Sequence, residues 1–354
     1  MTICIDCRMI NASGIGVYLR GILPFLLQSE NDFLLLGSKE QLSAFSSNKK
    51  TSIFECEAKP FSLRELFFFS KPLLQKINST DIFYSPFFNI PQKIKIPIFT
   101  TVHDIVFPDM PELTSRTGLA ARMWFYRRAY KKSKKIFTVS EFSKSRIESH
   151  LGKKKQIVVT HSAIGAMFSV YKKKANNSQK KDTIVFIGNI KKHKGLDCLL
   201  DAFILARNEG IQHKLIIIGS KNNFRTSDKS ILRKVESAGD GISFTGFISD
   251  EKLMEYLSTA ALLVQPSLYE GFCHPPLEAM VLGTQALISD IPVFREIYAE
   301  YPVTFFRAGD SDDLKEKLLI LLLKKSVKTI SLSQELTEKY TFQKTASIIM
   351  KEIE

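Results

Sequence analysis

Hydrophobic residues along this chain form short β-branched runs that alternate with longer helical patterns. An apolar helical pattern covers residues 16–28, between the first two of these runs. Continuous apolar runs separated by helices are typical of parallel strands buried on both faces of a sheet. The strands predicted in the first half are residues 2–6, 33–37, 81–85, 98–102, 135–140 and 157–161.

The same alternation restarts after a polar, lysine-rich segment at residues 169–182, which resembles a solvated linker. The later strands are predicted at residues 183–188, 214–219, 242–246, 262–267 and 285–290, and the helices at 196–208, 250–260 and 275–283. The pattern predicts two Rossmann-like α/β domains that face a cleft, with ligands at the carboxyl ends of the strands.

The expected boundaries follow from this change in composition. The first domain covers residues 1–170, the linker 171–182 and the second domain 183–335. Residues 336–354 are expected to form a C-terminal helix, with the option that it crosses back to the first domain.

Composition supports a soluble protein with two cores: 354 residues, 44% hydrophobic and 24% charged. The longest aliphatic run, Leu318 to Leu323, is far shorter than the roughly 20 residues that a membrane span needs. The N-terminus begins directly with a strand-like run and lacks the features of a signal peptide. We therefore expect a cytoplasmic protein.

Five cysteines, an odd number, argue against a disulfide framework. Cys4 and Cys7 are close in sequence, but residues three apart in a strand point to opposite faces, which favours buried thiols over a redox pair. The histidines are scattered, so no zinc site is expected.

The net charge of +14 indicates an anionic partner, either nucleic acid, an acidic membrane face or a phosphorylated ligand. No zinc-finger spacing or aromatic RNA-binding motif appears. Nucleic acid is therefore suggested by charge alone and is not expected.

Residues 186–195, FIGNIKKHKG, contain a strand end, Gly188 and a run of cations that precedes a helix. Backbone N–H groups and the ammonium groups of Lys191, Lys192 and Lys194 suit an anionic diphosphate. A solvated basic loop is the alternative.

Residues 266–280, PSLYEGFCHPPLEAM, hold two carboxylates eight positions apart. Glu270 lies in a glycine turn whose backbone amides can face a sugar or a phosphate. Pro276 suits the first turn of a helix that contains Glu278. Glu278 either interacts with the helix dipole or accepts hydrogen bonds from ribose hydroxyls.

At these residues the chain resembles the retaining GT-B glycosyltransferases of family 4. Their hallmark is two glutamates separated by seven residues, within a pattern close to PS-x-x-EGF-x-x-P-x-LEAM. The resemblance continues from ASGIGVYLRGIL near the start to YTFQKTA near the end. It is strongest to a bacterial branch that adds mannose or a related sugar during surface-polysaccharide assembly.

The resemblance implies a role for each residue. Glu270 approaches the donor sugar and stabilises positive charge at the anomeric carbon, Glu278 binds the ribose, and Lys194 neutralises the leaving diphosphate. Asn189 occupies a position where many members have arginine, so Lys192 is expected to supply the second cation. The implied donor-binding residues are Gly14, Gly16, Gly188, Asn189, Lys192, Lys194, Phe247, Ile248, Gly271, Phe272, Cys273, His274, Leu277 and Glu278.

In the first domain, the resemblance places His103 beside the transferred sugar and Gly14 and Gly16 in a glycine-rich loop. Small residues there would allow close contact and unusual dihedral angles. Asp104 either orients the imidazole or meets the acceptor. Ser140 is predicted to cap the helix that follows it.

Residues 116–135 interleave aromatic residues with lysines and arginines at helical spacing. Such a helix can lie on an anionic bilayer, and residues 65–74, ELFFFSKPLL, would reinforce this interpretation. Packing of the aromatic face in the core is the alternative.

These observations lead to one expected reaction. The enzyme transfers a hexose, with GDP-mannose as the first choice of donor, to a saccharide or lipid-linked saccharide at the inner face of the cell membrane. No cofactor or metal is expected, because amides and lysines can stabilise a diphosphate. The alternatives are a UDP-glucose or UDP-N-acetylhexosamine donor, and a non-enzymatic protein that binds nucleic acid or membrane.

Overall fold

The computed structural model forms two compact units. Unit 1 comprises Met1–Gly165 and Tyr340–Glu354, and unit 2 comprises Ala166–Lys339. The residues described are 1–46, 49–62, 69–165, 167–168, 170–171, 179–219, 229–323 and 329–354.

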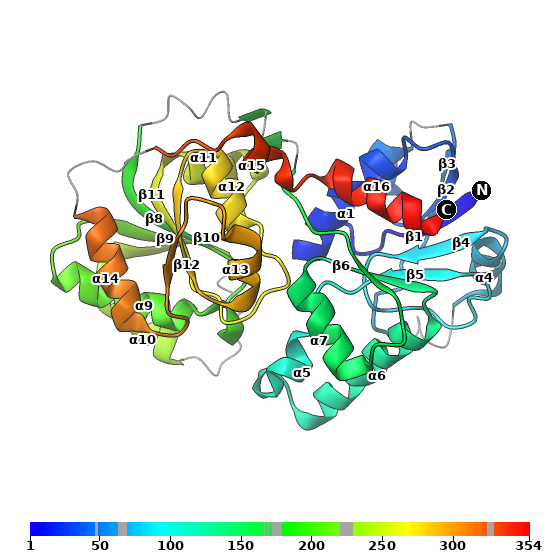
Figure 1. The fold of residues 1–354 in the computed structure, drawn as a ribbon, viewed down its shortest axis with the longest axis horizontal. Coiled ribbons are helices and arrows are strands. Elements are labelled where there is room, and N and C mark those ends of the chain that lie inside the picture. Colours follow the sequence, from blue (N-terminus) through cyan, green and yellow to red (C-terminus); the bar gives the residue numbers. More distant parts are fainter. Residues whose placement is uncertain are drawn as a thin grey trace. The chain divides into compact units, whose positions relative to one another are not determined.

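Unit 1 is built around a seven-stranded parallel sheet in the order β3-β2-β1-β4-β5-β6-β7 (Figure 1). The strand order reverses between β1 and β4, and Ile3 of β1 pairs with Phe33 on one side and Ile82 on the other. The strands are β1 (Thr2–Asp6), β2 (Asp32–Gly37), β3 (Thr51–Glu55), β4 (Ile82–Ser85), β5 (Ile98–Thr101), β6 (Lys135–Thr138) and β7 (Ile157–Val159).

Helices complete unit 1, and the last of them comes from the end of the chain. The α-helices are α1 (Ser13–Leu26), α2 (Lys39–Leu42), α4 (Lys71–Asn78), α5 (Val106–Asp109), α6 (Arg116–Lys132), α7 (Glu141–Leu151) and α16 (Phe342–Ile353). Two 3-10 turns are η1 (Ser43–Phe45) and η2 (Pro111–Leu113). The Ser140 hydroxyl accepts the Ser143 N–H at 3.0 Å, which confirms the predicted N-cap of α7.

Unit 2 contains a six-stranded parallel sheet in the order β10-β9-β8-β11-β12-β13. In chain order this is 3-2-1-4-5-6, the Rossmann arrangement, with its reversal between β8 and β11. The strands are β8 (Lys181–Ile187), β9 (Lys214–Ile218), β10 (Ile242–Gly246), β11 (Ala260–Gln265), β12 (Gln285–Ser289) and β13 (Thr304–Phe306).

The helices of unit 2 cover its sheet. They are α9 (Leu196–Asn208), α10 (Lys229–Ser237), α11 (Asp250–Thr259), α12 (Pro275–Val281), α13 (Pro292–Tyr298), α14 (Ser311–Leu322) and α15 (Gln334–Lys339), with 3-10 turns η3 (Lys192–Lys194) and η5 (Gly239–Gly241).

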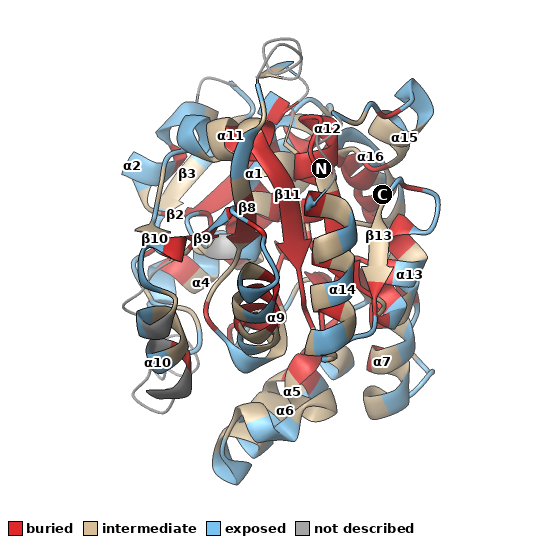
Figure 2. Ribbon diagram, turned by 90° about the vertical axis from the view of Figure 1, so that its left-hand side faces the viewer, coloured by how far each residue is buried: buried red, intermediate tan, exposed pale blue. Residues whose placement is uncertain are grey.

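The core of unit 2 explains the longest aliphatic run in the sequence. Leu314, Leu318 and Leu322 of α14 are buried with Phe203 of α9, and β11 is buried along its whole length (Figure 2). Residues four apart lie on one helix face, so Leu318 and Leu322 of the run belong to a core-facing stripe, whereas Ile320 and Leu323 are exposed. Within the described ranges, no helix combines the length and apolar character needed to cross a bilayer.

The predicted α/β fold with two Rossmann-like domains is confirmed, and all the predicted strands are present. The prediction missed β3, whose residues are only partly buried, and the three-residue strand β13. Strand β8 includes Lys181 and Asp182, the last two residues of the expected linker, whereas residues 172–178 of that segment lie outside the described residues. Cys4 and Cys7 are buried free thiols, as predicted.

Candidate active site

The switch point of unit 2 brings two of the predicted motifs together. Residues 188–195 follow β8, and residues 266–274 follow the neighbouring strand β11. Open parallel sheets bind ligands at this point, outside the carboxyl ends of the strands.

A glycine lets these two loops touch. Gly195 has φ +69°, and a Cβ there would lie 1.9 Å from the carbonyl oxygen of Pro266. The Leu268 N–H donates to the carbonyl of His193 at 2.7 Å, which joins the loops through their backbones. This close approach places the side chain of Lys194 beside Glu270.

Glu270 and Lys194 form a direct ion pair. The ammonium nitrogen of Lys194 lies 2.7 Å from Oε1 and 2.8 Å from Oε2 of Glu270, and Ser267 Oγ donates to Oε1 at 2.7 Å. Gln265 Nε2 in turn donates to Ser267 Oγ at 3.0 Å. Burial alone would raise the pKa of Glu270, but the charge and hydrogen bonds of Lys194, with the Ser267 bond, hold it below its ordinary value. Glu270 is therefore ionised at neutral pH.

The pair keeps the capacity to bind a ligand. A carboxylate has about four acceptor positions and an ammonium group three donors, so each group can bind several partners at once. The Lys194 side chain is 21% exposed. A sugar hydroxyl can therefore donate to Glu270 while an anionic group accepts from Lys194.

Glu278 lies in α12, behind Pro275 and Pro276, as predicted. Burial raises its pKa to about 8, with a smaller contribution from the charge of Asp250. No group in the described ranges hydrogen-bonds its carboxyl. The carboxyl is therefore mostly protonated at pH 7 and has its hydrogen-bonding capacity available.

The segment between the two glutamates is rigidly held. Cys273 has φ +75°, unusual for a residue with a side chain, and its carbonyl accepts the hydroxyl of Tyr298. The rings of Phe272 and His274 lie 5.6 Å apart. Gly271 and Leu277 are buried, so the whole segment is packed against the core of unit 2.

The other predicted donor residues of unit 2 are spread along the same sheet edge. Gly188 follows β8 and donates to the Ile218 carbonyl, and the Asn189 carbonyl accepts from Lys191. Lys192 is exposed in η3. Phe247 and Ile248 follow β10, two strands from β8, and Phe247 is 82% exposed. Within the predicted set, the Lys194 ammonium group is hydrogen-bonded to the Glu270 carboxylate.

In unit 1, His103 follows β5. Its Nε2–H donates to the carbonyl of Pro86 at 2.9 Å, and Tyr18 contacts the ring edge-on. Burial lowers its pKa to about 4, so the imidazole is neutral at pH 7 and Nδ1 carries a lone pair. Asp104 Oδ1 accepts the Val106 N–H at 3.2 Å, a contact within its own turn.

The predicted glycine-rich loop is wrong. Gly14 and Gly16 lie in the first turn of α1, and neither has a positive φ. A Cβ at Gly16 would lie 2.5 Å from the Ile10 carbonyl oxygen, whereas a Cβ at Gly14 would meet nothing within 4 Å. A side chain at position 16 would collide with the Ile10 carbonyl, so local packing requires Gly16. Position 14 has room for a side chain.

Sequence reasoning missed several polar residues at the two switch points. Ser267 supports Glu270 and could have been found from the PS dipeptide of the motif. His193 has a buried Nδ1 without a hydrogen-bond partner among the described residues, and burial lowers its pKa to about 4.

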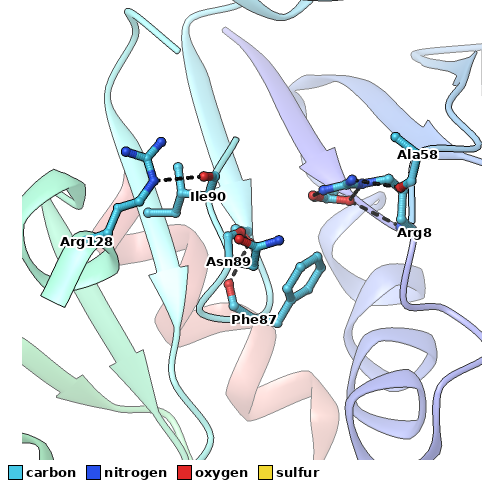
Figure 3. A network of polar contacts seen from close by, with 8 residues as sticks. Arg8, Ala58, Phe87, Asn89, Ile90 and Arg128 are labelled. Carbon is cyan, nitrogen blue, oxygen red and sulfur yellow. Dashed lines mark hydrogen bonds and ion pairs between the residues drawn. The ribbon is translucent and has the colours of Figure 1, made fainter. Parts of the chain in front are cut away.

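In unit 1, Arg8 binds Asp6 through two N–H···O bonds of 2.8 and 2.5 Å and donates to the Ala58 carbonyl at 2.9 Å (Figure 3).

The described ranges contain no group of three His, Cys, Asp or Glu residues arranged to hold a metal ion.

The fold consists of two Rossmann-like domains, and comparison with known proteins identifies the family. The model for "Glycosyl transferases group 1" matches residues 168–339, and that for "Glycosyltransferase Family 4" matches residues 59–165. Between them they account for most of the chain. The chain belongs to the family 4 glycosyltransferases.

Individual relatives are more distant. The serotype-specific mannosyltransferase WbdA of Escherichia coli is 32% identical over 44% of this chain and 20% of its own length. The O-antigen chain mannosyltransferase RfbU of Salmonella typhimurium is 27% identical over 56% of this chain and 53% of its own length. The chain thus spans between a fifth and about half of these curated relatives.

Solved structures share the fold. Sucrose-phosphate synthase from Thermosynechococcus elongatus has a TM-score of 0.73 at 15% identity, covering 100% of this chain and 98% of that one. Anabaena HepE in complex with UDP and glucose has a TM-score of 0.71 at 16% identity, covering 100% and 99%.

Proposed function

We propose that this protein is a retaining glycosyltransferase that moves a hexose from a nucleotide-sugar to a saccharide acceptor. The observation that carries the proposal is the buried, ionised Glu270 paired with Lys194 at the switch point of unit 2. Retention is inferred from the family motif that contains Glu270 and Glu278.

The pair suits the chemistry of sugar transfer. As the glycosidic bond breaks, negative charge grows on the leaving diphosphate and positive charge on the anomeric carbon. Lys194 stabilises the first charge and Glu270 the second, and both interactions strengthen in the transition state. Glu278 accepts hydrogen bonds from the ribose hydroxyls, and Lys192 adds a second cation near the diphosphate.

Unit 1 supplies the remaining roles in this proposal. Neutral His103 offers its Nδ1 lone pair to a hydroxyl of the transferred sugar, while its Nε2–H is fixed by Pro86. Asp104 orients the loop that carries His103. No cofactor takes part.

GDP-mannose is the proposed donor, because the two bacterial relatives described above are named as mannosyltransferases. A UDP-sugar is the alternative, supported by the fold shared with a protein solved with UDP and glucose. The proposed acceptor is a surface polysaccharide or a lipid-linked saccharide at the cytoplasmic face of the membrane.

A panel of radiolabelled nucleotide sugars, each incubated with a lipid-linked oligosaccharide extract, tests the proposal. Transfer from GDP-mannose alone supports the first choice, and transfer from a UDP-sugar supports the alternative. Absence of transfer from every donor would refute the proposed activity. The anomeric configuration of the product, measured by NMR, tests retention.

A further inference from the structure

Helix α6 of unit 1 has a composition unlike that of the other described helices. Its sequence, RTGLAARMWFYRRAYKK, contains basic residues throughout and no aspartate or glutamate. Only Tyr126 and Ala129 are fully buried, and Figure 2 shows the helix largely as intermediate and exposed. At 1.5 Å per residue the helix is about 25 Å long. Every charged side chain on this long helix is therefore cationic.

Two of its cations are used inside unit 1. Arg122 donates to Thr114 Oγ1 and to the Gly118 carbonyl, both at 3.1 Å. Arg128 donates to the carbonyl of Ile90 at 3.2 Å (Figure 3) and to that of Pro91 at 2.9 Å. Arg128 therefore binds the helix to another segment of unit 1, whereas Arg122 bonds at the N-terminal end of the helix itself. Neither arginine serves as a free surface charge.

The exposed side of α6 is formed by Ala120, Trp124, Arg127 and Lys131, which we name the Trp124 face. Their spacing of four, three and four residues places them on one stripe of the helix. Lys132 is exposed next to this stripe, and neither it, Arg127 nor Lys131 forms an ion pair within the described part of the chain. Trp124 is 45% exposed and is the only tryptophan in the sequence.

An aromatic cluster extends from this face. The rings of Trp124 and Phe125 lie 5.0 Å apart, and those of Phe125 and Phe61 lie 5.3 Å apart. Phe61 is itself 40% exposed. Large exposed aromatic side chains beside unpaired cations match the two components of an anionic bilayer surface: the apolar boundary and the lipid phosphates.

We propose that the Trp124 face docks on an anionic lipid bilayer, with α6 parallel to the membrane plane. The indole of Trp124 enters the headgroup boundary, and Arg127, Lys131 and Lys132 bind lipid phosphates. Charge complementarity selects this occupant, because the face contains no carboxylate that would favour a basic partner. This inference rests on the proposed function in one respect: docking brings the enzyme to a lipid-linked acceptor.

The single tryptophan allows a direct test. The protein is mixed with vesicles of phosphatidylcholine alone, or of phosphatidylcholine with about 30% phosphatidylglycerol, an anionic lipid. We expect the Trp124 emission to shift to shorter wavelength, and the protein to co-sediment, only with the anionic vesicles. Raising the salt concentration should reverse both effects, because screening weakens the attraction.

Matched variants separate this face from the overall charge. Changing Arg127, Lys131 and Lys132 together to Gln should weaken vesicle binding on the order of 100-fold. Changing the exposed Lys39, Lys49 and Lys351 of the same unit to Gln removes the same charge and should leave binding nearly unchanged. Trp124→Ala, followed by sedimentation, should weaken binding severalfold while leaving the helix cations in place.

Equal binding to neutral and anionic vesicles, or equal weakening by both triple variants, would overturn the proposal. Preferential binding to a DNA duplex, with no vesicle binding, would also overturn it. Nucleotide binding by the variant with Arg127, Lys131 and Lys132 changed to Gln distinguishes the two proposals. If this variant binds the donor as the parent does but no longer binds vesicles, the result supports the Trp124 face, whatever the donor panel shows for transfer.

Discussion

The two units have the same strand order around their switch points, and each has a buried ion pair there. The two pairs differ in which parts of the chain they join. In unit 1, Arg8 and Asp6 lie two residues apart on the chain that leaves β1. In unit 2, Lys194 and Glu270 are 76 positions apart and come from the loops after two neighbouring strands. The first pair is local, whereas the second joins two loops.

The accessibility of the two pairs differs as well. The side chains of Arg8 and Asp6 are 2% and 0% exposed, and both Asp6 oxygens accept from the same guanidinium group. Lys194 is 21% exposed and binds through a single ammonium nitrogen. A bidentate, sealed pair stabilises a loop, whereas an accessible pair between loops can exchange a partner for a ligand. This difference supports a structural role for the first pair and the chemical role that we propose for the second.

Breaking the unit 1 pair should have the largest effect on stability. Arg8→Met leaves Asp6 charged and buried, so the free energy of unfolding should fall by roughly 3–5 kcal/mol. Urea denaturation measures this loss. The double variant Arg8→Met with Asp6→Leu should recover much of it, and the folded fraction of either variant should bind nucleotide as the parent does. A loss below about 1 kcal/mol would contradict a structural role.

Glu270→Gln should have the largest effect on turnover. Losing the carboxylate should lower kcat by about 10²- to 10³-fold, the scale of removing one transition-state contact. Steady-state kinetics with the accepted donor measures this change, and Glu316→Gln on the exposed side of α14 is the matched control. Unchanged kcat with reduced stability would make Glu270 structural, like Asp6.

Glu278→Gln should change how stability depends on pH. In the native state the Glu278 carboxyl has a pKa of about 8, whereas in the unfolded chain its pKa has the ordinary value of 4.5. Between these two pH values the native state holds a proton that the unfolded chain has released. The stabilising contribution of Glu278 is therefore fully present below pH 4.5 and is lost as the pH rises through 8. The variant avoids that loss, so it should exceed the parent by roughly 2–4 kcal/mol above pH 8 and match it at acid pH.

Urea midpoints at several pH values test this prediction, and a difference that shrinks with rising pH would contradict it. Glu278→Ala, which removes the acceptor oxygens, should bind nucleotide about 1–3 kcal/mol more weakly if Glu278 accepts ribose hydrogen bonds.

Ser267→Ala should have the smallest effect. It removes one hydrogen bond from ionised Glu270, so the pKa of Glu270 should rise and the acid limb of the pH–rate profile should move upward. The change corresponds to about 1 kcal/mol. Ser249→Ala, which removes the N-cap of α11, should leave this limb in place. An unshifted limb would show that Ser267 does not tune Glu270.

The sequence predicted the fold well because nearly every strand is apolar on both faces. Strand β3 was not predicted, because it contains Thr51, Ser52 and Glu55 and is only partly buried at the sheet edge. Helix α14 was not predicted for a different reason. Its aliphatic run was interpreted only as a candidate membrane segment. Edge position and helix packing are tertiary properties that local patterns do not report.

The site was predicted in its residues but not in its contacts. Glu270 and Lys194 came from their motifs, yet their pairing depends on the approach of Gly195 to Pro266, which needs β8 and β11 side by side. The proton on Glu278 likewise depends on burial by distant parts of the chain.

Helix α16 has a consequence for how the chain folds during synthesis. It packs on α1 so closely that a Cβ at Gly21 would lie 2.2 Å from the ring of Phe342, and Lys135 of β6 binds Glu352 at 2.7 Å. Unit 2 is continuous in sequence, whereas unit 1 needs residues from both sides of it. A ribosome therefore releases all of unit 2 before unit 1 can close. In the meantime the apolar side of α1 is uncovered, and a chaperone would have its main opportunity to bind there.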